Sequence, residues 1–308
     1  MTAITFALAV AAVSLAGCGG GTPGTPMGVT NPGQLRDNTP KVLEVSTPGE
    51  AVIEHEKAVM DYSNISEGYF CVRSKISSTK VKVLVTVNAT GNQYQYTIYN
   101  TDQFIVIPLS EGNGSYSVGI WENLTGDEYM AIFGQELNVT LRDQLKPFLY
   151  PNQYVNFAAG DSSTQLAVQA ATGATSEIEA INGIYTWVIK NVTYDEEKML
   201  TVASGYLPNN AHTISAKKGI CFDYAVLTVS MLRGQGVAAK LVIGYAGAAY
   251  HAWIEVYSVE SGKVFTYVLV GNQWQREMDP TFDAARQGTR DLSGAIGNGS
   301  NYVPIQYY

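Results

Sequence analysis

The chain has few basic residues and few of the side chains that bind transition metals. Its 308 residues include 19 Lys and Arg against 27 Asp and Glu, for a net charge of −8. No basic stripe or cluster occurs, so nucleic acid is not an expected partner. The three cysteines and three histidines form no close pair such as C-x-x-C or H-x-x-x-H, so the usual zinc signatures are absent. A hydrophobic content of 46% is nevertheless enough for a sizeable core, and the length suggests about two domains.

The first residues predict an export signal. Positions 3–17 form an unbroken run of apolar and small residues, with no Lys or Arg before it. Its length suits a secretory signal and is short for a bilayer span. The run ends in Leu15-Ala16-Gly17-Cys18, which resembles a bacterial lipobox and implies cleavage before Cys18 and lipid attachment to its sulfur. We therefore expect a signal peptide at 1–17 and an exported lipoprotein anchored at the bacterial cell surface.

The next two segments are a linker and a β-rich domain. Residues 18–40 are rich in glycine and proline, which predicts a flexible tether. From 41 to 145, short runs of alternating apolar residues are separated by turn residues, as at Val81, Val83 and Val85. This pattern predicts an all-β, immunoglobulin-like sandwich domain. We expect its single histidine, His55, to be structural.

The periodicity becomes helical after residue 145. Ser176 and Glu179 resemble a capping box, and apolar residues follow at helical spacing up to 188. A polar loop is expected next, and then a second helix that begins at Cys221 and ends near Gly234. Strands are predicted at 239–245, 250–257, 264–270 and 274–278. This order predicts an α+β domain over residues 146–308.

Three residues of this second domain can supply a thiol nucleophile with an oriented base. Cys221 opens a predicted helix, His251 lies 30 positions later on a predicted strand, and Asp279 ends a strand after another 28. The positive end of the helix dipole favours the thiolate that attacks a carbonyl. His251 would pair with the thiolate and protonate the leaving amine, and Asp279 would orient the ring. Asp283 is a rival for the role of the acid.

The sequence around these residues resembles the transglutaminase-like superfamily, a papain-related group of thiol enzymes. The resemblance covers about residues 160–283. It implies a papain-like transglutaminase core with Cys221 as nucleophile, His251 as base and Asp279 as orienting acid, and neither metal nor organic cofactor. A lone Cys, His or Asp is more often structural, so the prediction depends on the joint context. The segments that carry it are Tyr194-Asp195, Gly219-Ile220-Cys221-Phe222-Asp223-Tyr224-Ala225, Leu232-Arg233-Gly234-Gln235-Gly236-Val237, Val242-Ile243-Gly244-Tyr245, His251-Ala252-Trp253-Ile254-Glu255-Val256 and Met278-Asp279-Pro280-Thr281.

The oxyanion hole is where the chain departs from this pattern. A papain-type glutamine shortly before the cysteine is absent, because no glutamine lies between Gln169 and Gln235. Trp187 precedes Cys221 by 34 positions, but it lies on a predicted amphipathic helix and we interpret it as core. The backbone N–H of Cys221 is one candidate donor, and Tyr194 is the second.

The remaining features have structural interpretations. Cys71 lies in a strand-like run and is expected to be a small buried apolar side chain. A disulfide between Cys71 and Cys221 is the alternative in an oxidising compartment, and it would block the nucleophile. Seven Asn-x-Ser/Thr sequons occur, which we interpret as polar surface because of the lipobox.

The sequence thus predicts a surface-anchored cysteine enzyme that cleaves or transfers peptide or glutamine-type amides through a Cys221 acyl-thioester, with hydrolysis favoured over cross-linking. The expected partners are an extracellular protein or cell-wall peptide substrate, and the membrane through Cys18. The alternative is a non-enzymatic adhesion or binding lipoprotein that uses the β-sandwich and keeps the second domain as scaffold. A metal site at Cys221, His251 and Asp279 is disfavoured by the lack of a close ligand pair.

Overall fold

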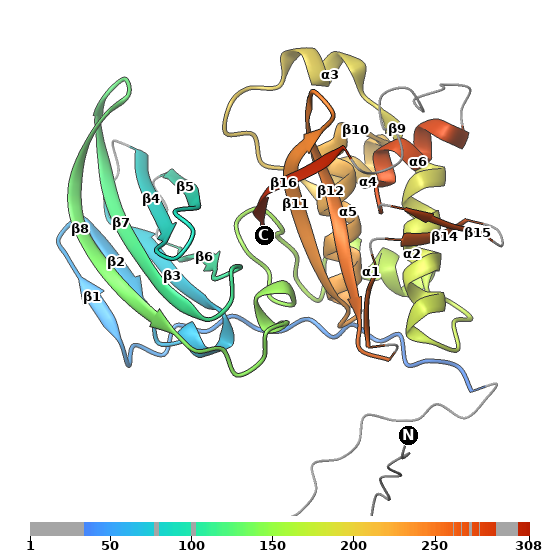
Figure 1. The fold of residues 1–308 in the computed structure, drawn as a ribbon, viewed down its shortest axis with the longest axis horizontal. Coiled ribbons are helices and arrows are strands. Elements are labelled where there is room, and N and C mark those ends of the chain that lie inside the picture. The colour runs from blue at the N-terminus through green and yellow to red at the C-terminus, as the bar shows by residue number, and fades with distance from the viewer. Residues whose placement is uncertain are drawn as a thin grey trace, which may run out of the picture.

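The computed structural model describes residues 34–76, 80–99, 103–260, 262–265, 267–270, 273–276, 278–287 and 301–308. An all-β part and an α+β part lie side by side, and the chain between 34 and 50 runs along both (Figure 1). The predicted signal peptide, Cys18 and most of the predicted tether lie outside the described residues. Within the described ranges, no helix is long and apolar enough to cross a membrane.

The all-β part consists of two antiparallel sheets with the strand orders β1-β2-β3-β6 and β5-β4-β7-β8. In β4 the inward-facing residues Val81, Val83 and Val85 are at most 2% exposed, so the alternation seen in the sequence is confirmed. The buried faces of both sheets contribute to one hydrophobic core. The elements are β1 (Val52–Glu54), β2 (Ala58–Asp61), the short 3-10 helix η1 (Ile65–Glu67), β3 (Tyr69–Ser74), β4 (Lys80–Val87), β5 (Gln93–Tyr99), β6 (Ile105–Pro108), β7 (Gly114–Thr125) and β8 (Glu128–Val139).

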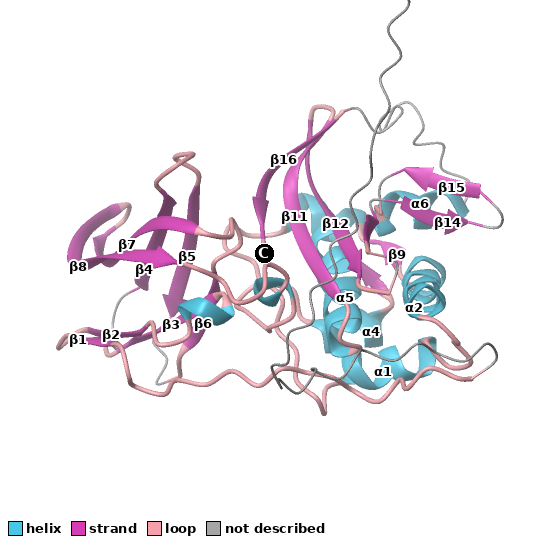
Figure 2. Cartoon of the chain, turned by 60° about the horizontal axis from the view of Figure 1, so that its bottom comes forward, coloured by secondary structure: helices cyan, strands magenta, loops and turns pink. Residues whose placement is uncertain are grey.

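The α+β part is built around a central helix, α5 (Cys221–Gly234), which is buried on nearly every side. It packs against the sheet strands β11 (Ala238–Ala246) and β12 (Ala249–Ser258) and against the helices α1 (Ser162–Ala170) and α2 (Glu177–Asn191). The sheet has the order β13-β12-β11-β16, with β13 at Lys263–Phe265 and β16 at Tyr302–Tyr307. Figure 2 shows these helices gathered on one side of the sheet. The predicted fold class, antiparallel β-sheets followed by an α+β core, is confirmed.

Two segments differ from the prediction. The strand expected at 264–270 is divided, because β13 pairs with β12 whereas β14 (Tyr267–Val270) forms a hairpin with β15 (Gln273–Arg276). Residues 271 and 272, between β14 and β15, lie outside the described residues. The expected polar loop before α5 contains four short elements, which depend on caps and tertiary contacts and so leave no periodic pattern. They are β9 (Thr193–Tyr194), α3 (Glu196–Thr201), α4 (Asn210–Ala216) and β10 (Lys218–Gly219).

The predicted cap of α2 is present in a modified form. The Ser176 side chain accepts a hydrogen bond from the backbone N–H of Glu179 at 3.2 Å. The Glu179 carboxylate in turn accepts the N–H of Thr175 at 2.7 Å, one residue before the position expected for a capping box. The helix therefore begins where the sequence predicts.

The two parts are joined through Arg233, near the C-terminal end of α5. Arg233 is 1% exposed and donates hydrogen bonds to the main-chain oxygens of Tyr150, Ala239 and Tyr308 at 2.7–2.9 Å. The ring of Tyr308 contacts those of Tyr94 and Tyr96 in β5. One buried cation therefore links the chain leaving the sandwich, the start of β11 and the end of β16. The 3-10 helix η2 (Lys146–Phe148) lies in the connection between the two parts.

Candidate active site

Cys221 is the first residue of α5, and the chain enters this helix from a short parallel strand pair. In that pair Gly219 of β10 lies opposite Tyr194 of β9. A Cβ on Gly219 would lie 2.6 Å from the Cβ of Asp223, so the absence of a side chain lets Asp223 fold back on the helix entry. The carboxylate of Asp223 accepts the N–H of Ile220 at 2.8 Å. Cys221 is thereby held in the first turn, where the helix dipole favours an anion.

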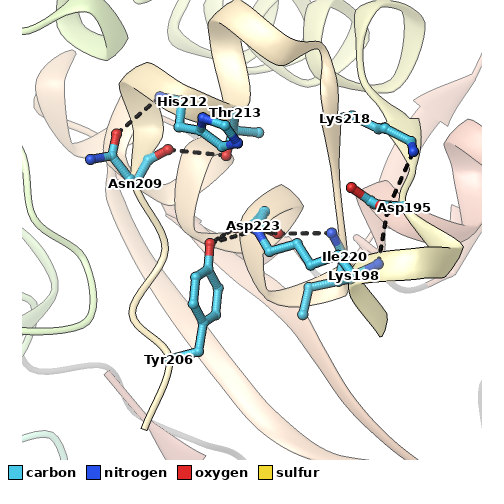
Figure 3. A network of polar contacts seen from close by, with 9 residues as sticks. All are labelled: Asp195, Lys198, Tyr206, Asn209, His212, Thr213, Lys218, Ile220 and Asp223. Carbon is cyan, nitrogen blue, oxygen red and sulfur yellow. Dashed lines mark hydrogen bonds and ion pairs between the residues drawn. The ribbon is translucent and has the colours of Figure 1, made fainter. Parts of the chain in front are cut away.

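The buried Asp223 is also the centre of a partly buried polar network (Figure 3). Its Oδ1 accepts the hydroxyl of Tyr206 at 2.5 Å, and its Oδ2 accepts the ammonium of Lys198 at 2.7 Å. Lys198 Nζ lies 2.6 Å from the Tyr206 hydroxyl as well. Lys198 belongs to α3, whose N-cap Asp195 forms an ion pair with Lys218 of β10 at 3.3 Å. The network fastens the segment 195–206 to the start of α5, beside Cys221.

Asp223 lies within one of the motifs, but no role for it was predicted from the sequence. A signal was available, since an acidic residue at the third position of a helix commonly accepts the backbone N–H of the N-cap. Lys198 and Tyr206 gave no comparable signal, because their contact with Asp223 depends on how the loop folds.

His251 and Asp279 form a direct contact in the interior. His251 Nε2 and Asp279 Oδ2 are 2.6 Å apart, and the two residues are 7% and 2% exposed. A single β-bridge between Ile254 of β12 and Met278 holds the residue that precedes Asp279 against β12. Asp279 then immediately precedes α6 (Pro280–Gln287).

The carboxylate of Asp279 is fixed by donors on both oxygens. Oδ1 accepts the backbone N–H groups of Thr281 and Phe282, at 3.1 and 3.2 Å. Oδ2 accepts the hydroxyl of Tyr302 at 2.8 Å, in addition to its contact with His251. Because the N–H groups at the start of α6 and the hydroxyl approach from different directions, the carboxylate has little freedom to rotate away from the imidazole.

The imidazole of His251 favours its charged form. Burial alone would lower its pKa, but the charge and hydrogen bond of Asp279 and, to a smaller extent, the nearby Cys221 raise the pKa to about 10. Since Nε2 is occupied by Asp279, Nδ1 is the ring nitrogen left for Cys221. A buried imidazolium beside a partly exposed thiol can stabilise a thiolate and later deliver a proton.

The structure thus brings Cys221, His251 and Asp279 together, and it gives Asp283 a different partner. Asp283 Oδ2 accepts the hydroxyl of the fully buried Tyr185 at 2.5 Å. This contact holds α6 on α2.

The other residues named from the sequence lie in varied surroundings. Tyr194 and Trp187 are both partly buried against the core, as expected for Trp187. The role of Tyr194 as an oxyanion donor stays a prediction. Cys71 is 1% exposed and is not bonded to Cys221, so its predicted place in the core is confirmed. Burial, with a smaller effect of Asp61, raises the pKa of Cys71 to about 12, which makes it an inert thiol.

One family model matches part of the α+β region. Residues 164–280, less than half of the chain, match the family model of the transglutaminase-like superfamily. This part of the chain is therefore a transglutaminase-like superfamily domain, and such domains are typically Cys-His-Asp thiol enzymes. A curated relative, the UPF0252 protein MJ1282 of Methanocaldococcus jannaschii, is 28% identical over 92 residues. The match covers 28% of this chain and 23% of the relative, so the matched region is about a quarter of that protein's length.

Similar solved structures include a candidate cysteine protease from Cytophaga hutchinsonii, at 15% identity, 78% coverage of both chains and a TM-score of 0.37. The periplasmic domain of TgpA from Pseudomonas aeruginosa is 12% identical, with 80% of this chain and 100% of that chain covered and a TM-score of 0.35. A transglutaminase from red sea bream is 11% identical, with 69% and 48% covered and a TM-score of 0.29. At these values the likeness carries no inference about activity.

Proposed function

We propose that this protein is a cysteine enzyme that transfers the acyl group of an amide through a thioester on Cys221. The observation that supports the proposal best is the 2.6 Å contact between His251 and Asp279, with Cys221 nearby at the start of α5. A buried His–Asp pair by itself is often structural. Here the pair meets a partly exposed thiol at the first turn of a helix, which is the environment that activates a cysteine.

In the proposed first half-reaction, the thiolate sulfur of Cys221 forms a bond to the carbonyl carbon, and the π electrons move to the oxygen. The backbone N–H of Cys221 is the proposed donor to that oxygen. When the carbonyl re-forms, the C–N bond breaks and His251 gives its Nδ1 proton to the leaving nitrogen. The products are an amine or ammonia and the Cys221 thioester.

In the second half-reaction, water or an amine attacks the thioester carbon while Nδ1 of His251 accepts a proton from the nucleophile. The C–S bond breaks and restores the thiolate beside the imidazolium. Water gives a carboxylic acid, and an amine gives a new amide. We propose peptide or glutamine-type amides in extracellular proteins or cell-wall peptide as the substrates, with hydrolysis favoured over cross-linking.

Export and anchoring through lipidated Cys18 complete the proposal and rest on the sequence alone. Fractionation of the producing bacterium tests this part. We expect the protein in the membrane fraction and release of the Cys18→Ser variant, whereas an unchanged distribution of the variant would contradict lipid anchoring.

Trapping the acyl-enzyme tests the catalytic proposal. A blocked glutamine peptide is incubated with the protein, with or without hydroxylamine as acceptor, and the protein and products are analysed by mass spectrometry. We expect an acyl adduct on Cys221, glutamate product in water and a hydroxamate with hydroxylamine. Cys221→Ala should abolish all three, and Cys71→Ala, which changes the buried cysteine, should retain them. Turnover by Cys221→Ala would refute the mechanism, and a folded protein without turnover or adduct would favour the adhesion hypothesis.

A further inference from the structure

Tyr302 lies in β16, outside the matched range of residues 164–280, and reaches the His251–Asp279 pair from the opposite side of β11. Its hydroxyl donates to Oδ2 of Asp279 at 2.8 Å, the same oxygen that lies 2.6 Å from His251 Nε2. Its ring lies edge-on to Trp253, with ring centroids 5.0 Å apart. Two donors therefore converge on one carboxylate oxygen.

Gly244 makes this approach possible. It pairs with His251 on one side and with Pro304 on the other, next to an irregularity in the β11–β16 register. A Cβ at Gly244 would lie 2.1 Å from the Val303 carbonyl oxygen and 2.8 Å from the Trp253 ring. The missing side chain leaves room for β16 to come close and for the Trp253 ring to lie against Gly244.

Resting on the function proposed above, we propose that Tyr302 is a positioning residue whose hydroxyl holds Oδ2 of Asp279 toward His251. The backbone N–H groups fix Oδ1, so the hydroxyl supplies the remaining constraint on Oδ2. By donating to the shared oxygen it also stabilises the negative charge of Asp279, so the Nε2 proton stays on His251 and the ring stays an imidazolium that can give its Nδ1 proton to the leaving amine. A purely structural tyrosine would need only some acceptor for its hydroxyl.

The other end of β16 contacts the β-sandwich, so the position of Tyr302 depends on that part of the protein as well. Gln306 Nε2 donates to the main-chain oxygen of Gln93 at 2.8 Å, and the Tyr308 ring packs on Tyr94 and Tyr96. The strand that carries Tyr302 is therefore anchored on β5. The β-sandwich thereby helps to position the residue that fixes Asp279.

The test compares Tyr302→Phe with the wild type. This variant keeps the ring against Trp253 and removes only the hydroxyl. We expect kcat/KM to fall about 10- to 100-fold, the effect of losing one hydrogen bond to a charged group. The loss should lie in kcat with KM unchanged, and the rate of Cys221 alkylation by iodoacetamide at pH 7 should fall with it. The Nε2–H proton resonance of His251 should also shift, because its acceptor oxygen loses a second donor.

Tyr307→Phe is the matched control, since it makes the same change in the same strand. The ammonium of Lys240 lies over the ring of Tyr307. Tyr307→Phe should leave the alkylation rate and the resonance unchanged. If Tyr302→Phe has the same Cys221 alkylation rate and the same His251 resonance as the wild type, the inference is overturned, even if the melting temperature of the variant is lower. These two measurements need no substrate. They therefore separate failure of this inference from failure of the proposed function, which the Cys221→Ala experiment detects.

Discussion

Two aspartates near the start of α6 illustrate how the immediate partner of a carboxylate decides its role. Asp279 and Asp283 are 2% and 7% exposed and lie one helical turn apart. Asp279 faces the imidazole of His251, whereas Asp283 faces the hydroxyl of Tyr185. The two carboxylates are therefore similarly buried but have different hydrogen-bond partners.

Exchange of each carboxylate for an amide should separate these roles. Asp279→Asn removes the charge beside His251 and can hold the wrong tautomer, so kcat/KM should fall on the order of 10³-fold. Asp283→Asn should keep activity within about threefold, since Asp283 is hydrogen-bonded to Tyr185, and should lower the melting temperature because this buried contact is weakened. Steady-state kinetics and thermal unfolding check both variants. A larger kinetic effect from Asp283→Asn would transfer the role of the acid to that residue.

The raised pKa of His251 also predicts a pH dependence of stability. The folded pKa is about 10 and the ordinary value is 6.5, so the folded state binds the proton more tightly. The stabilisation is complete below about pH 6.5 and is lost as the pH rises toward 10. Urea unfolding from pH 6 to 10 should show a steeper decline in the unfolding free energy of the wild type than of His251→Gln. Parallel curves would contradict the assignment.

At the scale of elements, the start of α5 depends on a segment that has no core of its own. The helix α3 buries no residue, and its attachment runs through Lys198 and Tyr206 to Asp223. The carboxylate of Asp223 is fully buried. Removing its cationic partner would leave a charge that water cannot reach.

Lys198→Met should therefore destabilise the protein by about 3 kcal/mol, as expected when one partner of a buried ion pair is removed. It should also slow Cys221 alkylation, because Asp223 holds the helix entry through Ile220. Lys75→Met is the control: it breaks an ion pair with Glu54 at the surface and should change neither quantity measurably. Urea unfolding and the alkylation rate distinguish the two variants, and equal behaviour would refute the structural role of the network.

At the scale of the whole molecule, the features with local signals could be predicted from the sequence. The period-two pattern of β4 and the helical pattern after Cys221 identified these two elements. The motifs predicted the pairing of His251 with Asp279, whose side chains lie in contact. Tyr302 could not be found this way, because its contact with Asp279 depends on a strand far along the chain. The short helices α3 and α4 were missed for a related reason: polar caps and contacts define them, and no apolar stripe does.

The buried Arg233 joins three separate segments of the chain through its hydrogen bonds. In Arg233→Met, three main-chain oxygens from separate segments would each lose one hydrogen bond, and that of Tyr308 would keep the N–H of Leu241. Since a hydrogen bond to a charged group contributes about 1.5–3 kcal/mol, we expect a total loss of at least about 3 kcal/mol in urea unfolding. Arg142→Met, at a side chain 74% exposed, should have little effect. A similar small effect of both variants would show that the junction is not held by Arg233.

The most direct test of the catalytic account is the pH dependence of Cys221 alkylation by iodoacetamide, followed by mass spectrometry in the wild type and in His251→Ala. We expect fast labelling of the wild type at or below pH 7. In His251→Ala the labelling should be slow and should rise only above about pH 8, as for an ordinary thiol. Identical profiles for the two proteins would contradict the thiolate–imidazolium pair, and with it the proposed acyl transfer.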